Sequence, residues 1–113
     1  MVLGRSIVNK IELIDLLKTL KNVLIDNPFS KENALVARHK ESRKWFALII
    51  EIDGKLAINL KCDPMKSDFL RQVNSAIIPA WHMNKVHWNT VFVNDINLNE
   101  LKELIEHSYE LTK

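Results

Sequence analysis

The sequence contains little glycine and cysteine, and this scarcity already excludes several classes of function. Of its 113 residues, two are glycine and one is cysteine. Loops that cradle phosphates need several glycines where the backbone approaches the ligand, so nucleotide sites of the G-x-G-x-x-G or Walker type are excluded. A lone cysteine excludes an intrachain disulfide and a C-x-x-C zinc knuckle. It also fits a reducing compartment such as the cytoplasm.

The sequence also lacks long hydrophobic runs. No apolar stretch approaches the roughly 20 residues that span a bilayer, and the first residues lack the pattern of a signal peptide. We therefore expect a cytoplasmic, monomeric protein with no membrane contact. A length of 113 residues, 47% of them hydrophobic, provides for one compact domain over residues 1–113.

No strong excess of either charge is present, but the charges are unevenly distributed. Sixteen Lys and Arg against fourteen Asp and Glu give a formal charge of +2. Residues 1–61 carry 11 basic and 7 acidic side chains, whereas residues 62–113 carry 5 and 7. An anion-binding site is therefore expected in the first half or at a local basic cluster.

The first half of the chain predicts one helix followed by strands. Asn9 and Glu12 form an N-x-x-E capping box, and apolar residues at helical spacing extend the predicted helix to about Asp26, before Asn27-Pro28. Strands are predicted over residues 34–39, 45–52 and 55–62. Asp53-Gly54 is the predicted turn of a hairpin between the last two.

The second half predicts a short helix, two extended segments and a final helix. Asp63-Pro64 is a favourable helix start, and Met65, Phe69 and Val73 mark one face of that short helix. Extended chain over 77–80 and a strand over 89–93 follow, before a helix that opens at Asn97. The order α-β-β-β-α-β-β-α predicts a single α+β domain of two layers, in which helices cover a mainly antiparallel sheet.

Residues 80–91, with the sequence AWHMNKVHWNTV, hold two of the three tryptophans and two of the four histidines. This segment resembles the signature of the MmcQ/YjbR family of small bacterial proteins. Segments 44–49, 59–64 and 103–109 resemble further parts of the family pattern, and residues 28–42 depart from it most. The positions that carry the signature are Trp81, His82, Asn84, Lys85, His87, Trp88, Asn89 and Thr90.

The resemblance implies a fold related to frataxin and to type III secretion chaperones, and it implies DNA binding. A physical basis for DNA binding exists in residues 38–44, where four permanent positive charges accompany one negative charge at a predicted strand connection. Cations at a hairpin tip can contact phosphates on both sides of a groove. The residues expected to contact duplex DNA, weakly and in a salt-sensitive way, are Arg38, Lys40, Arg43, Lys44, Lys85, His87 and Trp88.

Two other interpretations of the same residues stay open. A charged tip also keeps a hairpin soluble and monomeric, and tryptophans such as Trp81 and Trp88 also anchor small cores. The alternative function is a protein-binding or small-ligand-binding module, in which residues 81–88 line a pocket or dock a partner. In that case binding would depend little on salt.

Metal binding and catalysis find less support. His82 and His87 lie five residues apart without a nearby cysteine or carboxylate pair, which is no recognised ligand spacing. Cys62 shares the inward phase of a predicted strand, as a buried small hydrophobe would. Acidic residues follow the last helix at the spacing of a solvated face: Glu100, Glu103, Glu106 and Glu110. We therefore expect no metal site, no cofactor and no enzymatic activity.

Overall fold

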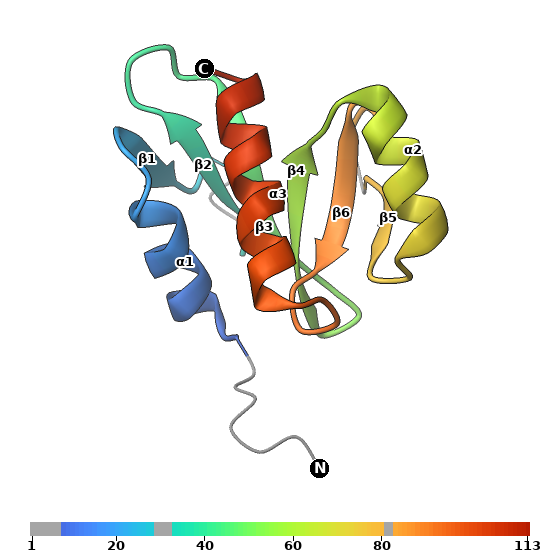
Figure 1. Cartoon of the computed structure of the whole chain (residues 1–113). Helices are drawn as coiled ribbons and strands as arrows, with labels where there is room; N and C mark the ends of the chain where they lie inside the picture. The colour runs from blue at the N-terminus through green and yellow to red at the C-terminus, as the bar shows by residue number, and fades with distance from the viewer. Residues whose placement is uncertain (1–7, 29–32, 81–82) are drawn as a thin grey trace.

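The computed structural model describes residues 8–28, 33–80 and 83–113. These ranges contain three helices, α1 (Lys10–Lys18), α2 (Pro64–Val73) and α3 (Leu98–Leu111). They also contain six strands, β1 (Val23–Asp26), β2 (Leu35–His39), β3 (Trp45–Ile52), β4 (Lys55–Lys61), β5 (Ile77–Pro79) and β6 (Trp88–Phe92). The strands form one antiparallel sheet in the order β1-β2-β3-β4-β6-β5. The predicted α+β class with an antiparallel sheet is confirmed (Figure 1).

The helices cover one face of the sheet and enclose the main core. Buried leucines of α1 and α3 pack with the inward residues of the strands, among them Ile49, Ile58 and Val91. Leu70 of α2 packs against the same cluster, so all three helices lie on this face. A second, smaller cluster lies on the other face, where Met83 packs against Ala34, Val36 and Leu48.

The hairpin turn between β3 and β4 forms as its sequence predicts. Asp53 and Gly54 both have positive φ, 50° and 78°, which is the backbone geometry of a type I′ turn. The turn fixes the register, so that Ile49 pairs with Ile58 and Ala47 with Leu60. Just beyond that last pair, the buried hydroxyl of Ser108 accepts from the Lys61 N–H at 2.9 Å and donates to the Phe46 carbonyl at 2.6 Å. Ser108 thereby attaches α3 to the end of this hairpin.

The prediction that the first helix extends to Asp26 is wrong. The capping box at Asn9 and Glu12 starts α1 as predicted, but α1 ends at Lys18 and residues 23–26 form the edge strand β1. Asn22, with φ of 56°, turns the chain between them in a conformation that asparagine tolerates. Apolar residues suit a helix or a strand equally in this stretch, and pairing with β2 favours the strand.

The helix face that Met65, Phe69 and Val73 mark is turned to solvent in α2. These side chains are 85%, 60% and 60% exposed, while Ser67 of the same helix is buried. Spacing of four residues identifies one helix face, but it does not say which face is inward. The orientation of α2 is set by polar contacts of Ser67 and Arg71, which are described below.

Candidate nucleic-acid interface

The basic turn and the motif loop lie at the same end of the sheet. Residues 40–44 join β2 to β3 at the end where β3 begins. Lys61, the last residue of β4, pairs with Trp88, the first of β6, and the Cys62 N–H donates to the His87 carbonyl at 2.8 Å. The antiparallel order therefore brings the two segments to the same end of the sheet, with the end of β4 between them (Figure 1).

Backbone contacts shape the turn of residues 40–44. The Lys40 N–H donates to the Asn22 carbonyl at 2.7 Å, and the Arg43 N–H donates to the His39 carbonyl at 2.8 Å. Arg43 has φ of 67°, in the left-handed region. All five residues of the turn are exposed. In the part of the chain that the structure describes, none of the ion pairs involves Lys40, Arg43 or Lys44.

Arg38 differs from the other predicted DNA contacts, because its charge is already paired. Its guanidinium makes a two-pronged contact with the Asp26 carboxylate on β1, with both Nη2–oxygen distances at 3.1 Å. The guanidinium also lies 5.9 Å from the Trp45 ring centroid. Its side chain is only 17% exposed. Arg38 therefore joins β1, β2 and β3 and is not available as a free phosphate ligand.

The loop of residues 83–88 is organised by Asn84. Its side-chain oxygen accepts from the Val86 N–H at 2.9 Å, and its carbonyl accepts from the N–H groups of His87 and Trp88. This Asx turn leaves Lys85 exposed and His87 half-buried. Trp88 is also half-buried. Of the family-motif positions, Trp81 and His82 lie outside the described residues.

Arg71 of α2 holds this loop against the body of the domain. Its Nε donates to the Asn89 side-chain oxygen at 2.5 Å, and its Nη2 donates to the carbonyls of Lys85 and Trp88. The Ser67 hydroxyl donates to the same Asn89 oxygen at 2.9 Å. Neither Ser67 nor Arg71 is among the site residues predicted from the sequence. Their spacing of four, which places two polar groups on one helix face, is the signal that could have found them.

The remaining motif residues have structural contacts as well. The Thr90 hydroxyl donates to the buried Asn59 side-chain oxygen at 2.5 Å, across the β4–β6 pair. Asn84, Asn89 and Thr90 therefore support the loop, while Lys85 is the motif cation that reaches solvent. Most polar residues of the family motif therefore stabilise the conformation of that loop.

His39, which sequence analysis did not single out, is buried at the base of the basic turn. Its Nε2 lies 2.8 Å from the Thr112 hydroxyl, and its ring centroid lies 4.6 Å from that of Tyr109. Burial lowers the pKa of His39, and the charges of Lys113 and Lys44 lower it further, against the opposing effects of the Tyr109 backbone and Glu110. His39 thus links the turn to the end of α3 as a neutral side chain.

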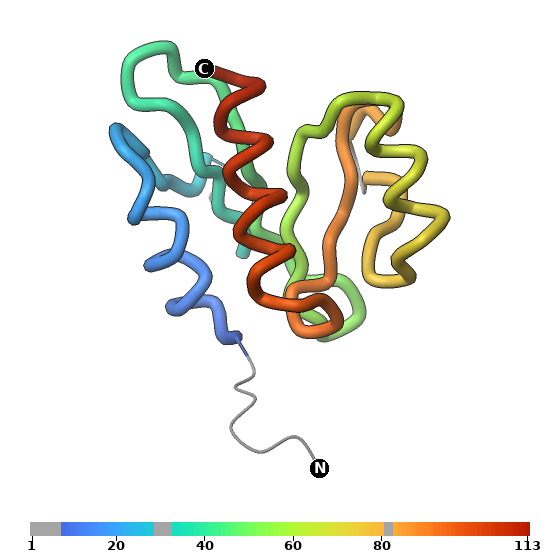
Figure 2. The backbone as a smooth tube through the Cα atoms, viewed as in Figure 1, coloured from blue at the N-terminus to red at the C-terminus, as the bar shows by residue number. Residues whose placement is uncertain are grey.

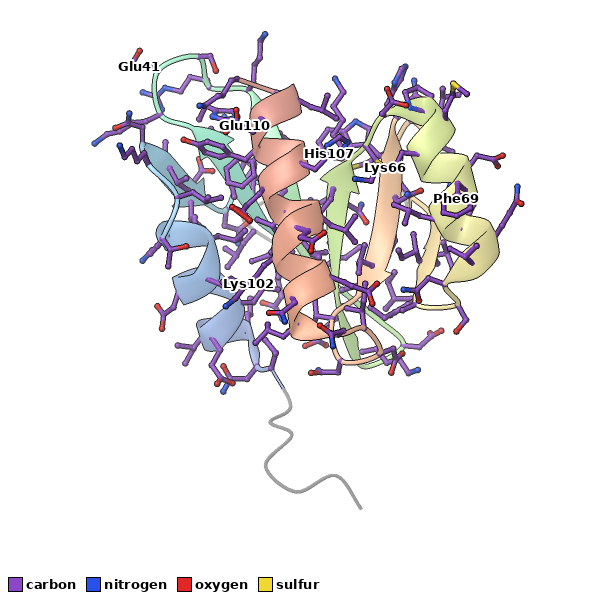
Figure 3. The ribbon with its side chains drawn as sticks, viewed as in Figure 1. Glu41, Lys66, Phe69, Lys102, His107 and Glu110 are labelled. Carbon is purple, nitrogen blue, oxygen red and sulfur yellow. The ribbon has the colours of Figure 1, made fainter. Side chains whose placement is uncertain are left out.

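His107 occupies a comparable position between α3 and α2. Its Nε2 accepts from the Asp63 N–H at 3.3 Å. Burial is the largest cause that lowers the pKa of His107, followed by the charge of Lys66, and Asp63 acts in the opposite direction. Figure 3 shows His107 and Lys66 in the region between the two helices.

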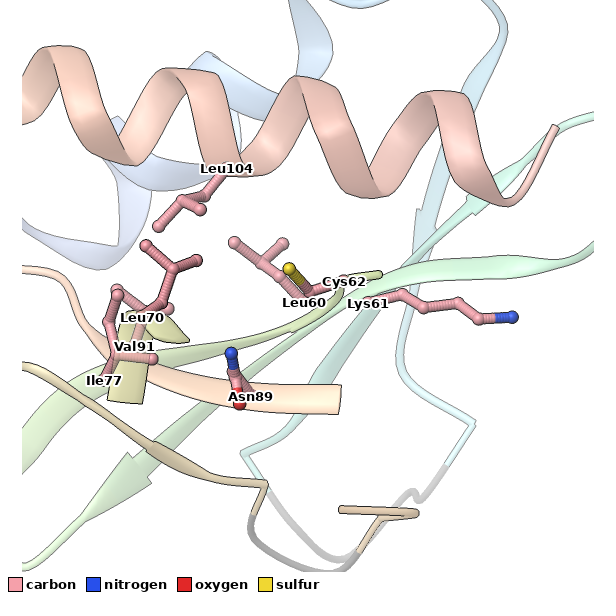
Figure 4. A pocket seen from close by; sticks show the side chains of 8 residues that line it. All are labelled: Leu60, Lys61, Cys62, Leu70, Ile77, Asn89, Val91 and Leu104. Atoms are coloured by element: carbon pink, nitrogen blue, oxygen red, sulfur yellow. The ribbon is translucent and has the colours of Figure 1, made fainter. Parts of the chain in front are cut away.

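Cys62 lies in the interior, as predicted for a buried small hydrophobe. It is 4% exposed, and burial raises the pKa of its thiol. The thiol lines a cavity of about 10 Å³ with core side chains such as Leu70 and Leu104 (Figure 4). A void of this size holds at most about one water molecule. The thiol therefore lacks both the exposure and the lowered pKa of a reactive nucleophile.

The acidic residues of α3 are all exposed, and they are spread along the helix. Across residues 8–28, 33–80 and 83–113, no three His, Cys, Asp or Glu side chains gather closely enough to hold a metal ion. None of the helices in these ranges is long and apolar enough to cross a membrane.

Comparison with known proteins identifies the family. Residues 18–111 match the family model YjbR. The uncharacterized protein YyaQ of Bacillus subtilis (strain 168) is 36% identical over 100 residues, which cover 78% of this chain and 84% of YyaQ. The uncharacterized protein YjbR of Escherichia coli (strain K12) is 33% identical over 66 residues, which cover 58% of this chain and 56% of that protein.

Solved structures share the fold over nearly the whole chain. A crystal structure of a Pseudomonas syringae protein superposes with a TM-score of 0.84 at 34% identity, covering 94% of this chain and 100% of that one. A Deinococcus radiodurans protein gives a TM-score of 0.78 at 32% identity, covering 88% of this chain and 75% of that one. In sequence and in fold, the chain belongs to the YjbR family.

Proposed function

We propose that this protein binds duplex DNA through the phosphate backbone, with weak and salt-sensitive affinity, and that it acts in the cytoplasm. The observation that carries the proposal is the position of the basic turn and the motif loop at one end of the sheet. Two segments that carry exposed cations and are far apart in the sequence thereby lie at the same end of the sheet. If the turn and the loop lay at opposite ends of the sheet, they could not contact the same DNA site.

The separation of the two segments fits a DNA groove. Neighbouring strands of a sheet lie about 4.8 Å apart, so β6 lies roughly 10 Å from β3 and roughly 14 Å from β2. The major groove of B-DNA is about 12 Å wide. The turn and the loop can therefore contact the phosphates on the two sides of one groove.

The cations available for this role are Lys40, Arg43 and Lys44 on the turn and Lys85 on the loop. All four are exposed. Within the described residues none of them takes part in an ion pair, so no such pair has to break when they contact phosphate. His87 and Trp88 border the loop contact. Phosphate contacts position a protein without reading bases, so we expect little sequence preference.

A salt titration tests this proposal. Each phosphate contact contributes about 0.9 to the slope of log K against log salt, so four contacts predict a slope of about −3.6. We expect fluorescence anisotropy with a labelled duplex to show affinity falling roughly 100-fold between 50 and 200 mM salt. The variant Arg43→Ala/Lys85→Ala, with one change in each segment, should reduce the slope by about 1.8.

The matched control removes two other exposed lysines, Lys18 on α1 and Lys102 on α3, which have no place in the proposed contact. The variant Lys18→Ala/Lys102→Ala has the same net charge as Arg43→Ala/Lys85→Ala. If the two double variants showed equal salt slopes, DNA binding would depend only on total charge, and a defined interface would be refuted. Affinity that does not depend on salt would refute the proposal entirely.

The alternative function, a protein-binding or small-ligand-binding module built on residues 81–88, predicts a different result. A ligand at this segment should change the intrinsic fluorescence of Trp88, with little salt dependence and no effect of Arg43→Ala. Titration of small molecules and candidate proteins under the same buffer conditions separates the two functions.

A further inference from the structure

A polar hollow lies between the basic turn of residues 40–44 and the C-terminal end of α3. Its volume is about 240 Å³. The rings of His39 and Tyr109, whose centroids lie 4.6 Å apart, form its inner wall. Figure 2 shows the turn and the end of α3 next to each other at one end of the domain. The polar residues that line the rim are Asn22, Lys40, Glu41, Ser42 and Lys113.

Hydrogen-bond donors reach the hollow from three separate segments of the chain. Lys40 and Ser42 belong to the turn, Asn22 precedes β1, and Lys113 follows α3. The Ser42 hydroxyl accepts from the Lys44 N–H at 3.3 Å, and its own proton stays available to a ligand oxygen. Ammonium, hydroxyl and amide groups together suit a ligand that is rich in acceptor oxygens.

The charges around the hollow favour an anion. Lys40 and Lys113 are exposed cations, and Glu41, at the outer end of the turn, is the acidic residue among the described ones that line it (Figure 3). Lys113 lies 3.4 Å from Glu110, but both side chains are more than half exposed, and such a surface pair contributes little. Burial is the largest cause that lowers the pKa of His39, and the charge of Lys113 lowers it further, so this cation acts on the inner wall.

A second hollow, which shares Tyr109 and Lys113 with the first, provides a contrast. Its volume is about 300 Å³. Lys21 also lines it, but so do the carboxylates of Glu106 and Glu110, so that its basic and acidic charges balance. In the first hollow the two ammonium groups exceed the single carboxylate of the described lining. An anion is therefore expected in the first hollow and not in the second.

We infer that the first hollow, which we call the anion hollow, binds the phosphate group of a small phosphomonoester between Lys40 and Lys113. A phosphomonoester carries a charge of about −1.5 to −2 and three strong acceptor oxygens, which match two ammonium groups and the neutral donors beside them. A phosphodiester, as in DNA, carries only a single charge. The volume of about 240 Å³ is below the roughly 300–1,000 Å³ of sites for drug-sized ligands, so the rest of the ligand is compact.

The anion hollow shares Lys40 with the proposed DNA contact, but the inference does not rest on that function. The donors of the hollow are present whether or not the turn contacts DNA. If both sites are used, a bound phosphomonoester occupies one of the four cations proposed for DNA. It should then reduce the salt slope of DNA binding by about 0.9. A small phosphorylated ligand would thereby regulate the affinity for DNA.

An NMR titration of the isotope-labelled chain with methyl phosphate tests the inference, at about pH 7.5 and with sodium chloride adjusted to keep the ionic strength constant. We expect saturable shifts of the amide signals of Asn22, Lys40 and Ser42, with a dissociation constant of about 1 mM. The signals of Thr19 and Glu106, in the second hollow, should shift less. Dimethyl phosphate, a diester with a single charge, should bind at least about tenfold more weakly.

Three variants locate the binding site. Lys40→Gln/Lys113→Gln should weaken binding of methyl phosphate at least about tenfold, because both ammonium groups are lost. The matched control, Lys18→Gln/Lys102→Gln, removes the same charge from α1 and α3 and should change the affinity by less than about twofold. Glu41→Gln should strengthen binding, because it removes a carboxylate from the rim. All five residues are exposed, and the dispersion of the amide signals establishes that each variant is folded.

A chain that shows no saturable shift with up to about 20 mM methyl phosphate would overturn the inference. Equal affinities of the two double lysine variants would also overturn it, because binding would then depend only on total charge. So would equal affinities for methyl and dimethyl phosphate, because the hollow would then accept the diesters of DNA or lipid as readily. Since the titration contains no DNA, none of these outcomes decides whether the proposed function is correct.

Discussion

The basic turn of residues 40–44 and the loop of residues 83–88 are built in opposite ways. The turn is shaped by backbone hydrogen bonds, and its charged side chains extend freely into solvent. The loop is held by side chains from other elements, chiefly Arg71, with Asn84 organising it from within. The turn therefore presents three cations on a backbone-shaped support, and the loop presents one, Lys85, on a support made by side chains.

Because of this difference, the charge of the turn can be changed independently of its structure, whereas the charge of the loop cannot. In the turn, a cation can be removed without loss of a structural contact. In the loop, most of the motif residues are contacts of the framework, and Lys85 depends on them for its position. Changes in the two segments should therefore affect stability and binding in different proportions.

The largest effect is expected from Arg71→Ala. This change removes charge-assisted hydrogen bonds to Asn89, Lys85 and Trp88, and we expect a loss of about 2–3 kcal/mol in the free energy of unfolding. Urea denaturation measures that loss. Hydrogen exchange should report faster opening of residues 84–88 than of β3, since the loop loses its main support.

Two further variants sharpen this result. Arg71→Lys keeps the charge but cannot reach three acceptors at once, so it should recover only part of the stability. Gln72→Ala changes the neighbouring exposed residue and should alter stability by less than about 0.5 kcal/mol. If Arg71→Ala were as mild as Gln72→Ala, the loop would not depend on α2.

Much of the fold follows from local sequence signals. The capping box at Asn9 and the turn at Asp53-Gly54 each specify their structure within a few residues, and both form as predicted. Residues 23–26 are different, because Val23, Leu24 and Ile25 are compatible with a helix or a strand. Only the nonlocal pairing with β2 decides between them.

The candidate site could be predicted in part. The charges of residues 40–44 and the motif loop are visible in the sequence, but two facts about them are not. Arg38 is neutralised by Asp26, which the predicted first helix would have placed elsewhere. The inward orientation of Arg71 depends on Asn89, eighteen residues away, and the spacing of the apolar residues in that helix does not indicate it.

A smaller effect is expected from pH, through His39 at the base of the turn. Its pKa is lowered in the folded state, mainly by burial, so below about pH 6.5 the unfolded chain binds more protons than the folded one. The stability is then fully present above about pH 6.5 and is lost as the pH falls toward the folded pKa. One such group changes stability by at most about 1.4 kcal/mol per pH unit.

Urea denaturation between pH 7.5 and 5 measures this dependence. His39→Gln should flatten the profile, and adding His107→Gln should flatten it further, because burial also lowers the pKa of His107. An unchanged profile in His39→Gln would show that protonation of this side chain does not couple to folding.

The smallest expected effect tests the independence of charge and architecture in the turn itself. Arg43 adopts φ of 67°, which glycine accepts and residues with a Cβ do not favour. Arg43→Gly and Arg43→Ala both remove the cation, so both should reduce the salt slope of DNA binding by about 0.9. Arg43→Gly should nevertheless be more stable than Arg43→Ala by about 0.5–1 kcal/mol, since only alanine keeps the backbone strain. If the less stable of these two variants also bound DNA more weakly, the turn would affect binding through its structure. The turn would then not differ from the loop in this respect.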